Sequence, residues 1–183
     1  MATPLESLLG KQIVSADAYD VGEITDVRYD PFEWDVVGLK IRTKRPDKLA
    51  AGFGKANLLI RPERFILNDV MLLAQPIDRL KDSVVPDNNN ISSLSSLASM
   101  KVVTKDNALL GTVVTLTVDT DAWKVRAITV RLDKTAIEAL KMKKGLFAKI
   151  TAEIPTSIIL SSKDMIHLKE PMDRVREHMT ILD

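Results

Sequence analysis

The chain has no cysteine among its 183 residues, which excludes disulfide bonds, thiolate metal sites and cysteine nucleophiles. It also has no excess of one charge, because 26 Lys and Arg residues stand against 25 Asp and Glu residues. A protein with this balance has no overall field that attracts nucleic acid or an anionic membrane, so any such binding would be local. No apolar run approaches the roughly 18 residues that a membrane-spanning helix needs.

The residues that are present indicate a folded protein, since 45% are hydrophobic and 28% are charged. The opening stretch MATPLESLLGKQ lacks the basic and apolar regions of a signal peptide. Together with the missing cysteine, this predicts a cytoplasmic protein with no direct membrane insertion.

The strongest pattern is an internal repeat. When the chain is shifted against itself by 89 positions, residues 8–41 align without a gap. The pairs of identical residues include Leu8 with Leu97, Gly22 with Gly111, Asp30 with Asp119, and Trp34 with Trp123. Further along, the offset grows to 95, so that residues 69–82 align with 164–177 and the second copy has gained six residues. Such self-similarity predicts a duplicated structural unit.

A Pro-, Asn- and Ser-rich segment separates the two copies and is typical of a linker. We therefore predict a first domain over residues 1–82, a linker over 83–95 and a second domain over 96–183.

Each copy is predicted to be mainly β, with five or six short strands and short helices between or after them. Ile24, Val27 and Tyr29 cannot all face one side of a regular strand, and one extra residue, a β-bulge, would restore the alternation. Val113, Leu116 and Val118 repeat the irregularity in the second copy. Bulges sharpen bends, so the pattern favours a small barrel or a strongly curled sheet.

These residues resemble the PRC-barrel, a small β-barrel of the photosynthetic reaction-centre H subunit and of the ribosome maturation factor RimM. The matching residues of the first copy are Leu8, Gly10, Val14, Gly22, Ile24, Asp26 and Val27. The second copy departs from the motif, with Ser99 in place of Gly10 and Thr115 in place of Asp26.

Two such modules in one short chain resemble the archaeal PRC-barrel proteins implicated in FtsZ-based cell division. The resemblance implies a non-enzymatic adaptor, recruited to the division site, that contacts division proteins such as the FtsZ membrane-anchor adaptor SepF or other PRC-barrel proteins. The resemblance to RimM implies the alternative, an RNA- or ribosome-associated maturation factor.

No residue pattern indicates catalysis, a metal or a cofactor, so we expect that the protein is not an enzyme and has no cofactor. Asp30 with Asp35, and Asp119 with Asp121, could be carboxylate pairs for acid–base chemistry or calcium, but aspartates also bond backbone amides where a hairpin reverses. We interpret them as turn residues. His167 and His178 are the only histidines, too few for a metal site that needs three or four ligands. The stretch AGFGK, residues 51–55, lacks the second half of a phosphate-binding motif and predicts a loop.

Basic residues gather between strands in both copies, where they could contact phosphates. The clusters are Arg42, Lys44, Arg45, Lys48 and Lys55, and then Lys141, Lys143 and Lys144. Neither is interleaved with the aromatic residues that stack single-stranded bases, so we do not expect nucleic acid as a partner.

Two helical segments are expected in the second copy. Residues 134–145 have helical spacing and end on Gly145, a common C-terminal cap. In the tail, Pro171 suits a first helical position, and Met172, Val175, Met179 and Leu182 form one apolar stripe. The stripe either packs on its own barrel or docks on a partner.

The third predicted strand carries apolar residues on both faces. Leu39 and Ile41 would fill the inner face, while Trp34 and Val36 would face outward, and Trp123 and Val125 repeat the outward pair. Exposed apolar groups mark contact surfaces. We therefore predict a homodimer that uses these four side chains. The alternative is that each Trp folds over the rim of its own barrel beside the aspartate-containing turn.

Overall fold

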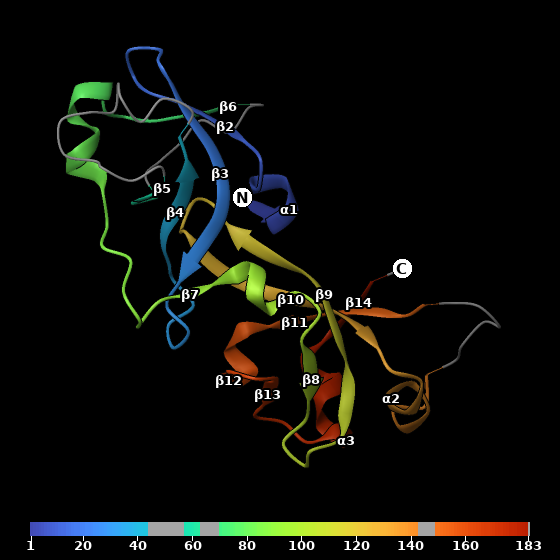
Figure 1. The fold of residues 1–183 in the computed structure, drawn as a ribbon. Helices are drawn as coiled ribbons and strands as arrows, with labels where there is room; N and C mark the ends of the chain where they lie inside the picture. The colour runs from blue at the N-terminus through green and yellow to red at the C-terminus, as the bar shows by residue number, and fades with distance from the viewer. Residues whose placement is uncertain (44–56, 63–69, 143–148, 183) are drawn as a thin grey trace. The chain divides into compact units, whose positions relative to one another are not determined.

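The computed structural model of the protein describes residues 1–43, 57–62, 70–142 and 149–182. It is mainly β, with a curled half-barrel sheet and a second sheet. The chain divides into two compact units (Figure 1). Unit 1 contains Met1–Ser95 together with Asp119–Lys124, and unit 2 contains Ser96–Val118 together with Val125–Asp183. No described helix has the length and apolar character that crossing a membrane requires.

The sheet of unit 1 has the strand order β5-β4-β3-β2-β6, and β7 pairs with β3. Neighbouring strands are antiparallel except β2 and β6, which are parallel. The strands of the first 95 residues are β1 (Ala2–Pro4), β2 (Gln12–Val14), β3 (Asp20–Tyr29), β4 (Val36–Arg42), β5 (Asn57–Ile60), β6 (Val70–Leu72) and β7 (Ser92–Ser93).

The sheet of unit 2 repeats this arrangement, with the order β12-β13-β8-β9-β10-β11-β14 and a parallel pair between β8 and β13. Its strands are β8 (Lys101–Val103), β9 (Leu109–Asp119), β10 (Lys124–Leu132), β11 (Thr151–Pro155), β12 (Ile159–Ser162), β13 (Ile166–Leu168) and β14 (Thr180–Leu182). The short helices are α1 (Leu5–Leu8), α2 (Lys134–Ala139) and α3 (Met172–Val175), with 3₁₀ helices η1 (Ile77–Ser83), η2 (Leu94–Leu97), η3 (Thr156–Ile158) and η4 (Arg176–His178).

The turn after the first strand of each copy shows how closely the two repeats agree. In unit 1 the Ser15 hydroxyl donates to Asp17 at 2.5 Å, and Asp17 accepts the amide of Ile77 at 3.0 Å. In unit 2 the Thr104 hydroxyl donates to Asp106 at 2.5 Å, and Asp106 accepts the amide of Met172 at 3.2 Å. In both cases the hydroxyl bond is the main cause that lowers the pKa of the aspartate. Each aspartate thus ties the turn to the first residue of a later helix, η1 in the first copy and α3 in the second.

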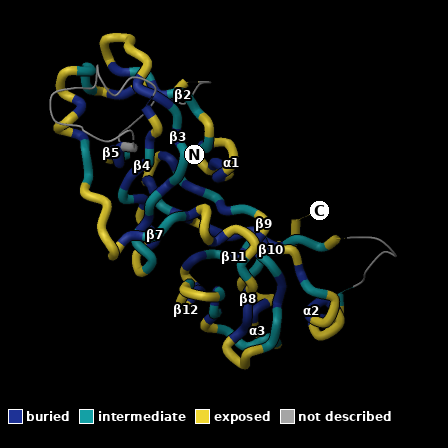
Figure 2. The backbone as a smooth tube through the Cα atoms, viewed as in Figure 1, coloured by how far each residue is buried: buried dark blue, intermediate teal, exposed yellow. Residues whose placement is uncertain are grey.

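The predicted β-bulge is present in β3. Ile24 pairs with Ile41 and Asp26 with Lys40, so one extra residue stands against β4 between these pairs. The shift lets Ile24, Val27 and Tyr29 all point into the core, where each is fully buried. In Figure 2 the buried residues of unit 1 follow β3 and β4. Val113, Leu116 and Val118 of β9 are buried in the same uneven spacing, which confirms the irregularity in both copies.

The segment 83–95, predicted to be a linker, is packed into unit 1 instead. Val84 bridges to Ile60 next to β5, β7 pairs with β3, and the side chain of Leu94 is fully buried. An ion pair of 2.8 Å between Arg28 and Asp87 links the middle of the segment to β3. The segment's Pro-, Asn- and Ser-rich composition predicted a linker, but some of its apolar residues are buried in the core and its β7 backbone pairs with β3.

Both helical predictions in the second copy were too long. Helix α2 ends at Ala139, and Lys141 adopts the left-handed conformation, with φ of 53°, that the sequence assigned to Gly145. Gly145 itself lies outside the described residues. The tail leaves helical geometry at Met179, with φ of −112° and ψ of 148°, and continues as β14, which pairs with β11. Backbone pairing with β11 therefore overrides the helical spacing of the apolar residues.

Candidate interaction site

The turn between β3 and β4, residues 30–35, is held by its first residue. One carboxylate oxygen of Asp30 accepts the backbone amides of Phe32 at 2.7 Å and Glu33 at 3.1 Å. The Trp34 amide donates to the Asp30 carbonyl at 2.8 Å, and Trp34 takes a left-handed backbone with φ of 62°. Asp30 therefore satisfies the amides of the reversal, which is the turn chemistry that the sequence predicts.

The equivalent turn between β9 and β10, residues 119–124, has the same construction. Asp119 accepts the amides of Asp121 at 3.0 Å and Ala122 at 3.3 Å, and Trp123 has φ of 49°. Turn structure thus explains the first aspartate of each pair, whereas the carboxylates of Asp35 and Asp121 form ion pairs with Lys124 and the N-terminal ammonium. Among the described residues, no group of three or more His, Cys, Asp or Glu is placed to hold a metal ion.

The two turns meet within unit 1. Asp35 and Lys124 form an antiparallel bridge, and the Val36 amide donates to the Trp123 carbonyl at 2.7 Å. The Lys124 ammonium also pairs with the Asp35 carboxylate at 3.0 Å. Asp35 and Lys124 occupy equivalent positions of the two copies, 89 residues apart. Opposite charges at one repeat position therefore join the two turns.

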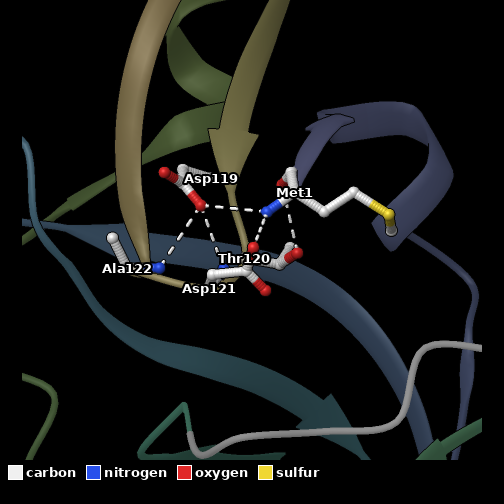
Figure 3. A network of polar contacts seen from close by, with 5 residues as sticks. All are labelled: Met1, Asp119, Thr120, Asp121 and Ala122. Atoms are coloured by element: carbon white, nitrogen blue, oxygen red, sulfur yellow. Dashed lines mark hydrogen bonds and ion pairs between the residues drawn. The ribbon is translucent and has the colours of Figure 1, made fainter.

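The N-terminal ammonium group binds the turn 119–124 (Figure 3). It contacts the carboxylates of Asp119, at 3.2 Å, and Asp121, while the Met1 carbonyl accepts the Thr120 amide at 3.0 Å. The hydrogen bond to Asp121 is the main cause that raises the pKa of the ammonium, and Asp119 adds to it. Two negative groups thus stabilise one positive group at the surface of unit 1.

The four side chains predicted to face outward are buried. Trp34 is 6% exposed and stacks on Tyr29 with ring centroids 5.2 Å apart, and Val36 is also buried. Trp123 and Val125 are buried in the same way. The prediction of an exposed apolar face at these residues is therefore wrong. Each Trp lies in the turn, outside the strand alternation that placed it, and Val36 and Val125 are covered at the first residues of their strands. The chain's own atoms cover these side chains and leave little surface for a second chain.

The apolar residues of the tail do not form one stripe. Val175 is fully buried, Met172 and Met179 are half-buried, and Leu182 on β14 is exposed. The first part of the tail therefore packs on unit 2, and its last residues form the final strand in the sheet order.

Most of both basic clusters lies outside the described residues, as does the stretch 51–55. Of the described members, Arg42 forms an ion pair with Glu23, and Lys141 ends helix α2. His167 is half-buried on β13, and His178 is exposed at the end of η4.

Sequence reasoning missed Phe32, which is 87% exposed at the tip of the turn 30–35. The signal was present in the repeat alignment, because Phe32 aligns with Asp121 and Glu33 with Ala122 in otherwise similar turns. The second turn has a charged residue at this position, so the turn itself does not require a large apolar residue there. Neither the comparison with known protein families nor the search of curated proteins returned a match.

Proposed function

We propose that the protein is a non-enzymatic adaptor that acts through protein contacts. The observation that carries this proposal is a turn built twice with the same bonds from an aspartate carboxylate to two backbone amides and with different displayed side chains. The first turn presents Phe32 and Glu33, and the second presents Asp121 and Ala122. A duplicated scaffold with two different surfaces is suited to binding two different partners.

The two units are proposed to be PRC-type barrels. The repeated strand order, the parallel closing pair in each unit and the bulged second strand support this proposal. Through the same resemblance, the adaptor belongs to an archaeal FtsZ-based division apparatus, where its partners are SepF or other PRC-barrel proteins. A homodimer, if formed, uses surfaces other than the buried Trp34 and Trp123.

Microscopy and direct binding test the division role. A fluorescent fusion of the full chain should form a ring that coincides with FtsZ, and the purified chain should bind purified SepF. Sedimentation with ribosomes, or RNA binding that weakens steeply with salt, would instead favour the maturation-factor alternative. A diffuse fusion with no SepF binding would contradict the proposal.

A further inference from the structure

Phe32 is a large apolar side chain that unit 1 displays almost entirely to solvent. The fold does not need it there. The equivalent turn has Asp121 at this position and keeps the same aspartate bonds and the same left-handed Trp. An exposed aromatic ring that contributes nothing to its own turn is a candidate for contact with another molecule.

The turn holds Phe32 in place before any partner binds. Asp30 bonds the Phe32 amide itself, and Trp34, two residues later, is buried against Tyr29. The Val36 amide and the Asp35 carboxylate then bond Trp123 and Lys124. An aromatic side chain with few rotatable bonds, carried on a fixed backbone, loses little conformational freedom on binding, which is why such residues dominate the energy of many interfaces.

The surroundings of Phe32 are acidic. The six residues 30–35 contain Asp30, Glu33 and Asp35 and no Lys or Arg. Asp30 is occupied by backbone amides and Asp35 by Lys124, whereas Glu33 is exposed beside Phe32. With Asp35 neutralised by Lys124, the exposed carboxylate of Glu33 still leaves negative charge beside Phe32, which disfavours RNA phosphates and anionic lipid headgroups and favours a basic protein surface.

We propose that Phe32 is the anchor of a docking surface for a folded protein that has an apolar pocket rimmed by Lys or Arg. The proposal rests on the proposed function as an adaptor. The phenyl ring fills the pocket, and Glu33 pairs with the basic rim.

Photo-crosslinking in the native cells identifies the occupant. Benzoylphenylalanine replaces Phe32 in the full chain, and the control places it at Ala122, the position equivalent to Glu33 in the second turn. We expect one protein to crosslink from position 32 and not from position 122, at a site lined by apolar residues and flanked by Lys or Arg. No crosslink from position 32, or a crosslink to lipid, RNA or a second copy of the chain, would overturn the proposal.

The purified pair then measures the contribution of each residue. Phe32→Ala should weaken binding by about 30-fold or more, as expected for a central aromatic anchor. Glu33→Gln should weaken it by about threefold at about 0.05 M salt and have less effect at about 0.5 M. Leu160→Ala, which removes another exposed apolar side chain (67% exposed), should leave the affinity within about twofold.

All three variants should keep the wild-type melting temperature, because none of the three side chains is buried. If the partner binds Phe32→Ala as well as it binds the wild-type chain, the anchor proposal is refuted while the adaptor function stands. If the fusion protein also fails to localise and SepF does not bind, the adaptor function fails independently.

Discussion

Replacing Gly22 with alanine should destabilise the protein strongly. Gly22 lies in β3 with φ of 142°, a backbone conformation that residues with a side chain rarely adopt. A Cβ atom there would lie 2.2 Å from the Arg42 carbonyl oxygen and 2.9 Å from Thr43 Cα. Both clashing atoms belong to the backbone at the end of β4, so the clash can be removed only if the paired strand moves.

Two costs add in this variant. The strained backbone costs about 1–3 kcal/mol, and displacement of a packed strand costs about 1–3 kcal/mol. We expect a loss of roughly 3 kcal/mol in the free energy of unfolding. At about 2–4 °C per kcal/mol for a chain of this size, the melting temperature should fall by about 6–12 °C. Gly111→Ala should have a smaller effect of about 1–3 kcal/mol, because its Cβ would lie 2.2 Å from the Arg131 carbonyl oxygen but its backbone is not left-handed.

Gly10→Ser is the matched control. Gly10 also has a left-handed backbone, with φ of 79°, but no atom lies within 4 Å of the added Cβ. The second copy already has Ser99 at this position, with φ of 67°. The substitution should cost about 1 kcal/mol. Thermal unfolding followed by circular dichroism compares the variants, and equal melting temperatures for Gly22→Ala and Gly10→Ser would refute the close-approach reasoning.

Three further predictions concern charge. The pKa of Asp17 and of Asp106 is lowered from 3.8, so the stabilisation they provide is present above that pH and is lost as the pH falls through the lowered pKa. Between about pH 5 and pH 2, the stability of the variant with both residues changed to Asn should therefore fall less steeply than that of the wild type. An unchanged slope would contradict this. The pKa of the N-terminal ammonium is raised from 8.0, so its stabilisation is complete below pH 8 and is lost as the pH rises through the raised pKa. Melting temperatures from about pH 7 to pH 10 should therefore depend less on pH in Asp121→Asn than in the wild type, and equal dependence would argue against the ion pair. Asp87→Asn removes the ion pair with Arg28 and should speed hydrogen exchange of the β7 amides by about twofold, whereas unchanged exchange would show that this pair does not hold the segment.

The sequence predicted the features that depend on local backbone requirements. The repeat alignment paired Gly22 with Gly111, and the structure shows that a Cβ at either position would meet the carbonyl oxygen of the neighbouring strand. The uneven spacing of Ile24, Val27 and Tyr29 predicted the bulge for the same reason, since each side chain must reach one core. A duplicated sequence tests such requirements twice, which is why these predictions held.

Predictions based on alternation failed where the residue lies outside a strand. Trp34 was assigned to an outward face by counting back from Leu39, but its left-handed backbone turns the ring onto Tyr29. In the tail, Met179 and Leu182 follow helical spacing, but β14 gains backbone bonds to β11 that no local pattern reveals. Pairing between residues about 30 apart in sequence decides this segment, and a single sequence does not encode that partner in its periodicity.

Differences between the two copies carry the information about function that the matches do not. Asp30 and Trp34 recur as Asp119 and Trp123 because the turn itself needs them. The tip side chains are free of that requirement, so Phe32 can serve a contact that its counterpart does not make. A difference between the copies does not by itself indicate a binding site. Gly10 is replaced by Ser99 in the second copy, but Ser99 keeps the left-handed backbone and displays no large apolar group. A difference between the copies indicates a binding site where both copies have the same backbone conformation and the side chain that differs is large, apolar and exposed. Burial of such a side chain by a partner removes a large apolar surface from water.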